Sequence, residues 1–398
     1  MLYFDRIDMT NKFDQIISRN GTASLKYDTR QGMFGKSDVL PLWVADMDFA
    51  APEAVQRALA MRASHPIYGY TIYPESLYQS LMQWLSTCHN WTVQRESILL
   101  CPGVVPSLNA SIYALTRPGD GVIVQPPVYA PFLSVPEITG RKLLPNPLKL
   151  VEGRYQFDFA GFEHCAAEGA RLLLLCSPHN PVGRVWQQQE LQTLLEICQR
   201  YDIIIVADEI HADLVYPGIT HVPLAKLAHD KVKIITAIAP SKTFNIPGLG
   251  LSALIVPDQA DRDAISKVFD SLHVSATNPF SIVAFEAAYR EGAVWLEELL
   301  DYLTGTRDFV RDYLLQHVPK IKLIEPEGTY LLWLDCRAMG LSDKQLKQFF
   351  VQEAGVGLSQ GGVFGAQGNG FVRMNIGAPR SVITQALDKI ARAVTAYI

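Results

Sequence analysis

The stretch Ala239-Pro240-Ser241-Lys242-Thr243-Phe244-Asn245 follows the apolar run 232–236. This run has the length and the β-branched content of a buried strand, so the sequence predicts that a strand ends just before Lys242. Partly apolar surroundings lower the pKa of a lysine, and a neutral amine attacks aldehydes. A lone lysine is more often a solvated surface residue. The neighbouring strands therefore decide what Lys242 does.

Three further buried strands are predicted upstream, at residues 122–124, 171–176 and 203–207. Residues 189–200, between the last two strands, carry one apolar face with helical spacing. Apolar strands that alternate with helices predict a parallel sheet covered on both faces. Ligands of such sheets bind beyond the carboxyl ends of the strands, where this chain carries polar residues.

Two of these polar residues are Asp208 and Asn180. Asp208 closes the strand at 203–207, and a buried carboxylate needs a partner such as a pyridinium N–H. Asn180 lies in the rigid turn Ser177-Pro178-His179-Asn180-Pro181-Val182-Gly183 and can donate its amide to a phenolate oxygen. The alternatives for Asp208 are a helix N-cap or, with Glu209 and His211, a metal site. Asn180 alone could be an ordinary turn residue.

Groups for a phosphate, an aromatic ring and a carboxylate are also present. Pro102-Gly103-Val104-Val105-Pro106-Ser107 opens a predicted helix, and the free N–H groups of Val104 and Val105 suit a phosphate. Tyr129 follows the strand at 122–124 and can stack on a ring. Arg373 lies in an apolar run, where its planar fork fits a carboxylate and a structural salt bridge is the alternative.

The four residue types occur along the chain in the order Asn, Asp, Lys and Arg. They supply an amide for a phenolate, a carboxylate for a pyridinium proton, an amine for a Schiff base and a guanidinium for a substrate carboxylate. Together they predict a protein that uses pyridoxal 5'-phosphate (PLP) as its cofactor and whose partner is a small-molecule amino-acid substrate. No metal is expected.

The composition of the 398-residue chain excludes several other classes. A net charge of −5 gives no basic surface for nucleic acid. No apolar run approaches the roughly 20 residues that a membrane helix needs, and charges within residues 1–8 argue against a secretory signal. The six cysteines are scattered without a CxxC pair, which indicates a cytoplasmic protein without disulfides or a zinc site.

The C-terminal part has a different pattern. A long helical stretch at 280–316, strands at 330–334 and 370–375, and helices at 343–352 and from 381 onward predict a smaller α+β domain. The strand-like residues 40–44 are expected to join it. We therefore predict an N-terminal segment at 1–47 that belongs to the small domain, a large PLP-binding domain at 48–283 and a small domain at 284–398.

The chain resembles the fold-type I PLP enzymes of the aspartate aminotransferase superfamily. Within that superfamily it is similar to the cystathionine β-lyase / C–S lyase subfamily (MalY/PatB type). The resemblance covers nearly the whole length, and two elements point to the lyases: Ala45-Asp46-Met47-Asp48-Phe49 and Asp208-Glu209-Ile210-His211. It implies an α/β fold with a mostly parallel seven-stranded sheet in the large domain.

The resemblance also implies a role for individual residues. Lys242 is the Schiff-base lysine and the catalytic residue, Asp208 the pyridine partner and Asn180 the phenolate partner, which also contacts substrate. Arg373 holds the substrate α-carboxylate, and Trp43 lies beside the substrate. The remaining cofactor-binding residues are Tyr129 on the ring, Val104, Val105 and Ser241 on the phosphate, His211, and Tyr70 on the phosphate of the neighbouring subunit of a homodimer.

Two positions depart from the pattern. Related lyases can carry a hydroxyl where Ala239 stands, and many aminotransferases have a phosphate-binding arginine where Gly250 stands. Without that arginine, the phosphate is expected to depend more on Ser241 and on backbone groups. A third difference is that typical aminotransferases have tyrosine in place of His211.

The resemblance predicts α,β-elimination from an S-substituted L-cysteine, such as cystathionine, to give a thiol, pyruvate and ammonia. Three alternatives stay open: an aminotransferase with the same cofactor, a regulatory protein that retains the fold, and an α/β enzyme without PLP. The sequence does not identify the physiological substrate.

Overall fold

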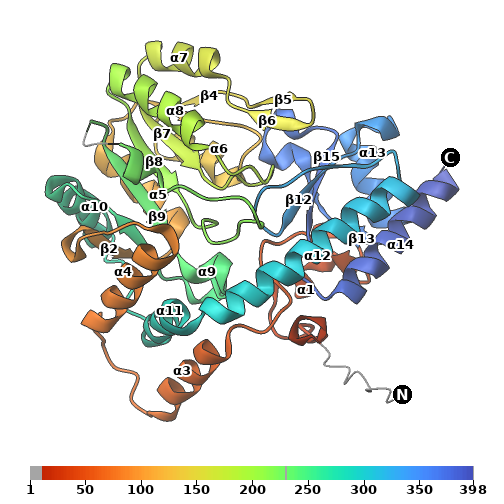
Figure 1. The fold of residues 1–398 in the computed structure, drawn as a ribbon, viewed down its shortest axis with the longest axis horizontal. Helices are drawn as coiled ribbons and strands as arrows, with labels where there is room; N and C mark the ends of the chain where they lie inside the picture. Colours follow the sequence, from red (N-terminus) through yellow and green to blue (C-terminus); the bar gives the residue numbers. More distant parts are fainter. Residues whose placement is uncertain (1–10, 229–230, 398) are drawn as a thin grey trace, which may run out of the picture.

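A seven-stranded sheet forms the centre of the larger part of the molecule (Figure 1). The computed structural model describes residues 11–228 and 231–397, so the charged residues 1–8 and the first ten residues of the predicted segment 1–47 lie outside the described residues. The strands follow one another across the sheet in the order β2 (Ile98–Cys101), β10 (Ser252–Ile255), β9 (Ile234–Ile238), β8 (Ile204–Asp208), β7 (Ala170–Cys176), β3 (Gly121–Val124) and β4 (Lys142–Pro145).

All strands of this sheet run parallel except β10, which is antiparallel to both of its neighbours. The predicted mostly parallel seven-stranded sheet is confirmed, and the predicted strands lie within two residues of the observed ones. The six parallel strands, β2, β3, β4, β7, β8 and β9, therefore end at the same edge.

Helices cover both faces of the sheet, because alternate side chains of its strands point to opposite sides. Leu172 and Leu174 of β7 pack with α5 (Val104–Leu115), α6 (Ala130–Ile138) and α10 (Gln259–Ser271). Leu173 and Leu175 pack on the other face with α7 (Phe159–Ala167) and α8 (Gln188–Tyr201). The remaining helices of this part are α3 (Glu53–Ser64), α4 (Glu75–His89), α9 (Pro240–Thr243) and α11 (Pro279–Glu291), and a hairpin joins β5 (Lys149–Val151) to β6 (Arg154–Gln156).

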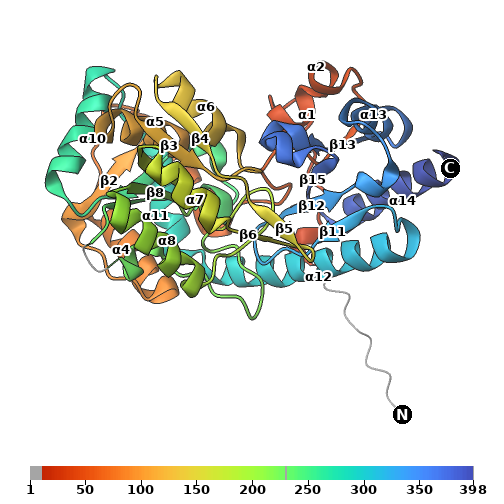
Figure 2. The ribbon, with the colours of Figure 1, turned by 90° about the horizontal axis from the view of Figure 1, so that it is seen from above.

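The C-terminal part contains a four-stranded antiparallel sheet. Its strands are β11 (Lys322–Ile324), β12 (Leu331–Asp335), β15 (Phe371–Asn375) and β14 (Ser359–Gln360), in that order across the sheet. Helices α12 (Ala293–His317), α13 (Asp343–Gln348) and α14 (Arg380–Tyr397) accompany it. Figure 2 shows α12 running from the larger part toward the smaller one.

The N-terminal segment lies against this smaller part. It contains the short helices α1 (Leu25–Asp28) and α2 (Arg30–Phe34), followed by β1 (Leu40–Pro41). Strand β1 pairs in parallel with β13 (Val356–Gly357). The strand expected at 40–44 is thus only two residues long, because the chain then turns toward the edge of the large sheet.

Two predicted helices are wrong in their extent. The stretch expected as one helix at 280–316 forms α11 and α12, which are separated by Gly292. A Cβ atom at Gly292 would overlap the ring of Phe244 and the carbonyl oxygen of Ala288, so the glycine permits this close junction. The helix expected at 343–352 is α13 followed by a π-helical turn at Phe349–Glu353.

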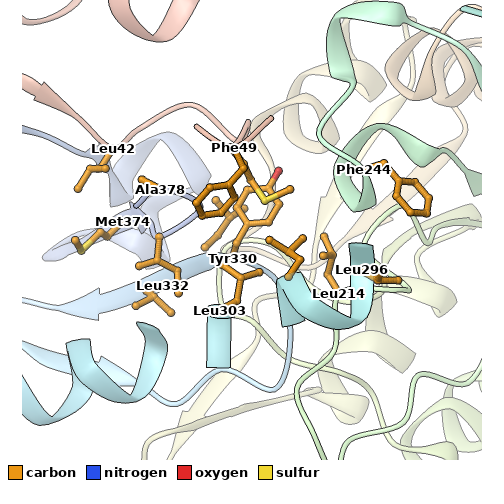
Figure 3. Packing of buried hydrophobic residues seen from close by; sticks show 14 of the residues in the cluster. Leu42, Phe49, Leu214, Phe244, Leu296, Leu303, Tyr330, Leu332, Met374 and Ala378 are labelled. Carbon is orange, nitrogen blue, oxygen red and sulfur yellow. The ribbon is translucent and has the colours of Figure 1, made fainter. Parts of the chain in front are cut away.

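One hydrophobic cluster joins the two parts of the molecule. It includes Leu42 and Phe49 of the N-terminal segment, Leu303 of α12, Tyr330 directly before β12, and Met374 of β15 (Figure 3). Figure 3 also shows Leu214 and Phe244 of the larger part beside α12. This shared core fixes Arg373, in β15, relative to the edge of the large sheet.

Candidate active site

The polar residues singled out in the sequence follow the strand ends along one edge of the large sheet. Cys176 of β7 lies opposite Asp208 of β8, and Asp208 lies opposite Ala237 of β9. The loop after β3 is tied to the loop after β7, because the backbone N–H of Tyr129 donates to the carbonyl of Asn180 at 3.0 Å. The predicted convergence of these loops is therefore observed.

Lys242 lies in the one-turn helix α9, directly after β9. Its Nζ donates to the carbonyl oxygen of Ala45 at 2.8 Å. Burial, helped by the positive charge of Arg373, lowers the pKa of Lys242 to about 8. At neutral to mildly alkaline pH a sizeable fraction of the amine is therefore uncharged, as a nucleophile toward an aldehyde requires.

Asp208 ends β8 and is buried. Its Oδ1 accepts a hydrogen bond from the N–H of Ile210 at 3.2 Å, and among the described residues no other group donates to the carboxylate. Burial raises its pKa to about 7. A cationic N–H placed against this carboxylate would favour its ionised form, so Asp208 suits a protonated ring nitrogen.

Asn180 and Arg373 meet across the boundary between the two sheets. Nη1 of Arg373 donates to Oδ1 of Asn180 at 3.0 Å, which leaves the Asn180 amide N–H groups to donate elsewhere. Nη2 of Arg373 donates to the carbonyl of Trp43 at 2.8 Å and to Oγ of Ser359 at 3.3 Å. Burial lowers the pKa of Arg373 to about 10, and its Nε has no partner among the described residues.

His211 is also buried at this edge. Its Nδ1 has no hydrogen-bond partner among the described residues, and its ring meets that of Tyr330 edge to face at 6.3 Å. Burial, with the charges of Lys242 and Arg373, lowers the pKa of His211 to about 3, so its ring is neutral at physiological pH. Glu209 instead pairs with His221 at 3.1 Å and accepts from the N–H of Leu224, so the two side chains do not converge.

The segment 42–49 forms one wall of the site and contacts both Lys242, through the carbonyl of Ala45, and Arg373, through the carbonyl of Trp43. The side chain of Asn245 holds it on one side by donating to the carbonyls of Met47 at 2.9 Å and Phe49 at 2.7 Å. Asn375 holds it on the other side by donating to the carbonyls of Val44 and Asp46, both at 2.6 Å.

The two aspartates of this wall are occupied by ion pairs. Asp46 accepts a bidentate pair of hydrogen bonds from Arg19 at 2.9 and 2.7 Å. Asp48 pairs with Arg19 and with the fully buried Lys26, both at 2.8 Å. The Ala-Asp-Met-Asp-Phe element therefore acts as a structural anchor behind the site, and its carboxylates face the N-terminal segment.

The end of the site that suits a phosphate lies at the start of α5. Val104 is the first residue of α5, so the N–H groups of Val104 and Val105 have no partner within the helix. A Cβ atom at Gly103 would lie 3.5 Å from the carbonyl of Gly250, so Gly250 borders this helix start. Ser241 lies in the first turn of α9. Gly250, at the position that carries arginine in many aminotransferases, thus has only backbone groups with which to contact a phosphate.

Tyr70 is the predicted site residue that the single chain does not bring to this edge. It lies in the connection between α3 and α4, and its side chain is fully exposed. Tyr129 lies at the start of α6, partly buried, and Trp43 lies in the wall segment, where its indole N–H donates to the carbonyl of Lys26 at 3.2 Å.

The comparisons with known proteins agree with this geometry. The family model described as aminotransferase class I and II matches residues 37–390. The chain belongs to this family. The class I and II membership confirms the predicted superfamily.

Several relatives within the aminotransferase class I and II family are closely similar. Cystathionine beta-lyase PatB of Bacillus subtilis (strain 168) is 41% identical over 385 residues, which cover 96% of this chain and 100% of that protein. Protein MalY of Escherichia coli (strain K12) is 30% identical, with coverage of 96% and 99%. The crystal structure of cystalysin from Treponema denticola, which contains a pyridoxal 5'-phosphate cofactor, has a TM-score of 0.94 at 34% identity and covers 98% of this chain and 100% of that chain.

The residues present fit PLP as judged from their unmet hydrogen-bonding capacity. Among the described residues, Nδ1 of His211 and Nε of Arg373 are buried without a partner, and the Asn180 amide has N–H groups to spare. An amine of lowered pKa, a buried carboxylate and a free helix start are arranged around the same edge. This donor set matches an aldehyde, a ring nitrogen, a phenolate and a phosphate on one ligand.

Sequence reasoning missed the residues that build the wall. Tyr330 donates its hydroxyl to the carbonyl of Ala45 at 2.9 Å, the same oxygen that Lys242 contacts. Asn245 and Asn375 were visible only as parts of motifs around Lys242 and Arg373. An asparagine with a positive φ of 55° at position 245 is a backbone feature that no sequence pattern discloses.

Proposed function

We propose that the protein is a PLP-dependent carbon–sulfur lyase that cleaves S-substituted L-cysteines such as cystathionine. The reaction consumes one water and yields a thiol, pyruvate and ammonia. The observation that carries the proposal is the meeting of Lys242, Asp208 and Arg373 at one strand edge, with an amine whose pKa is lowered to about 8. The similarity to PatB over 96% of the chain supports this chemistry over the others of the family.

Lys242 binds the cofactor aldehyde and later moves protons. When bound, PLP supplies an aldehyde for amines and a ring that accepts the electron pair left on the substrate α-carbon. With its pKa lowered to about 8, the amine of Lys242 would be able to take the proton from the substrate α-carbon. The carbonyl of Ala45 and the wall segment hold the amine at this edge.

Asp208, Asn180 and Arg373 orient the partners of this proton transfer. Asp208 holds a proton at the ring nitrogen, and Asn180 donates to the phenolate oxygen. Arg373 binds the substrate α-carboxylate with its fork, and Asn180 holds that fork through the 3.0 Å bond. The Ser241 hydroxyl with the N–H groups of Val104 and Val105 binds the phosphate, and Tyr129, His211 and Trp43 line the site.

We further propose that the protein acts as a homodimer and that Tyr70 binds the cofactor phosphate of the neighbouring subunit. The connection that carries Tyr70 exposes other large apolar side chains, among them Ile67, Tyr68 and Ile72. Such a contiguous exposed group is typical of an interface. Among the described residues no helix is long and apolar enough to cross a membrane. We also propose that the protein acts in the cytoplasm.

Incubation of the purified protein with cystathionine, without any 2-oxo acid, tests the activity. The proposal predicts stoichiometric release of pyruvate and thiol in the wild type and none in Lys242→Ala. A strict requirement for a 2-oxo acid acceptor would instead identify an aminotransferase. If cells that carry Lys242→Ala keep a phenotype that depends on the protein, the protein has a regulatory role, because this variant lacks the amine that catalysis requires.

A further inference from the structure

Behind Lys242, a largely buried carboxylate collects three hydrogen bonds that the proposed chemistry does not use. Oδ1 of Asp213 accepts from Nε1 of Trp84 at 3.0 Å and lies 2.7 Å from Nε2 of His89. Oδ2 accepts from the hydroxyl of Thr243 at 2.8 Å. Trp84 and His89 belong to α4, and Thr243 is the residue after Lys242, so Asp213 joins α4 to α9.

Helix α9 cannot hold its own shape. It has four residues, and a single helical turn is unstable unless other contacts fix it. The N–H of Phe244 closes this turn on the carbonyl of Pro240 at 2.9 Å. The residues just after Lys242 are held by side-chain hydrogen bonds. Thr243 donates to Asp213, and Asn245 donates to the wall segment. The direction of the Lys242 side chain therefore depends on contacts made by its neighbours.

The surroundings of Asp213 and His89 favour the ionised form of both side chains. Burial opposes the charge of Asp213, but His89, Thr243 and Trp84 outweigh it and lower the pKa of the carboxyl. Burial likewise opposes the charge of His89, whereas the hydrogen bond and charge of Asp213, with the charge of Glu209, outweigh it and raise the pKa of His89. An ionised pair of this kind gives charge-assisted bonds that are stronger than neutral ones.

We propose that Asp213, held by His89 and Trp84, is a positioning residue that aims Lys242 through the hydroxyl of Thr243. The inference rests on the proposed function of Lys242 and extends it to a residue that does not touch the cofactor or the substrate. Loss of the tether lets α9 rotate, and a misplacement of about 1 Å at a reacting group costs roughly 100-fold in rate.

The test uses three substitutions of threonine. Thr243→Val keeps the shape and removes the hydroxyl, and Thr243→Ser keeps the hydroxyl. Thr236→Val is the matched control, because the Thr236 hydroxyl is buried and has no partner among the described residues. Each protein is stripped of cofactor, and the rate at which it develops visible absorbance on mixing with PLP is measured. The kcat and KM for cystathionine are measured on the reloaded proteins.

Thr243→Val is expected to capture PLP about 10-fold more slowly and to lose about 10-fold or more in kcat, with KM within about twofold of the wild type. Thr243→Ser restores both rates to near wild-type values, and Thr236→Val leaves both unchanged. Asp213→Asn combined with Thr243→Val is no slower than the slower of the two single variants, because both changes break the same link.

Wild-type rates of capture and turnover in Thr243→Val would overturn the inference, as would equal losses in Thr243→Val and Thr236→Val. These results leave the proposed function intact, because the wild type still captures PLP and cleaves cystathionine. A wild-type protein that captures no PLP would overturn the proposed function and the inference together.

Discussion

Burial of a single amine is the feature on which the chemistry of this site depends. Lys242 loses hydration at the strand edge and faces the charge of Arg373, and both effects disfavour its protonated form. Asp208, at the end of the adjacent strand, is also buried, and its pKa rises to about 7. A cationic N–H against Asp208 would favour its ionised form, so the amine of Lys242 is the group at this edge that is suited to move a proton near neutral pH.

The pKa of Lys242 predicts how cofactor capture depends on pH. Below the pKa the amine is protonated and unreactive, so the capture rate of cofactor-free protein rises as the pH increases. The midpoint is expected near 8, where burial and Arg373 place the pKa of Lys242. Stopped-flow absorbance between about pH 6 and 10 measures this profile. The absorbance change of Lys242→Ala, which lacks the amine, is subtracted as the background. A midpoint near 10, as for an exposed lysine, would contradict the account.

Arg373→Lys tests carboxylate binding. Lysine keeps the charge but loses the planar fork that reaches both the substrate and Asn180. We expect KM for cystathionine to rise about 100-fold, because charge-assisted bonds contribute roughly 1.5–3 kcal/mol each. Steady-state kinetics measure it. Arg392→Lys, at an exposed position in α14, is the control and should leave KM unchanged. An unchanged KM in Arg373→Lys would contradict the assignment.

The junction between α11 and α12 shows how one residue limits the length of an element. The apolar pattern continues through residues 280–316, so a single helix is the natural prediction. Gly292 is the residue between α11 and α12, and the ring of Phe244 occupies the space where a Cβ atom would be. Phe244 follows Thr243, so this close contact also packs α11 against the loop of Lys242.

Gly292→Ala is expected to destabilise the protein by about 1–3 kcal/mol, the usual result of forcing an extra atom into a packed site. The melting temperature of the cofactor-free protein measures the effect. Gly32→Ala in α2 is the control, since nothing lies within 4 Å of the added atom. A melting temperature for Gly292→Ala equal to that of Gly32→Ala would show that the junction tolerates a side chain.

At the scale of the whole molecule, the site is incomplete within one chain if Tyr70 serves the neighbouring subunit. Lys242→Ala and Tyr70→Ala proteins are each expected to be nearly inactive. When the two are mixed and allowed to exchange subunits, each hybrid dimer regains one intact site, so about a quarter of wild-type activity returns. Pyruvate release before and after mixing measures this recovery. If pyruvate release after mixing stays at the level of the separate proteins, the site is not shared between subunits.

The sequence predicted much of this molecule because its strands are apolar and end in polar residues. Asp208, Asn180 and Lys242 were found because parallel strands expose their carboxyl ends together. The roles of Tyr330 and Asp213 were not found, since they depend on contacts with Ala45 and Thr243 that the fold alone creates. The fold class, the seven-stranded sheet and the family are confirmed, whereas the domain boundaries and the individual residue roles stay predictions.

Reduction of the PLP-loaded protein with borohydride, followed by peptide mass mapping, tests the central claim most directly. The account predicts that the cofactor is fixed to the peptide that contains Lys242 and that Lys242→Ala carries no label. A label on a different lysine, or a protein that stays colourless and unlabelled, would contradict it.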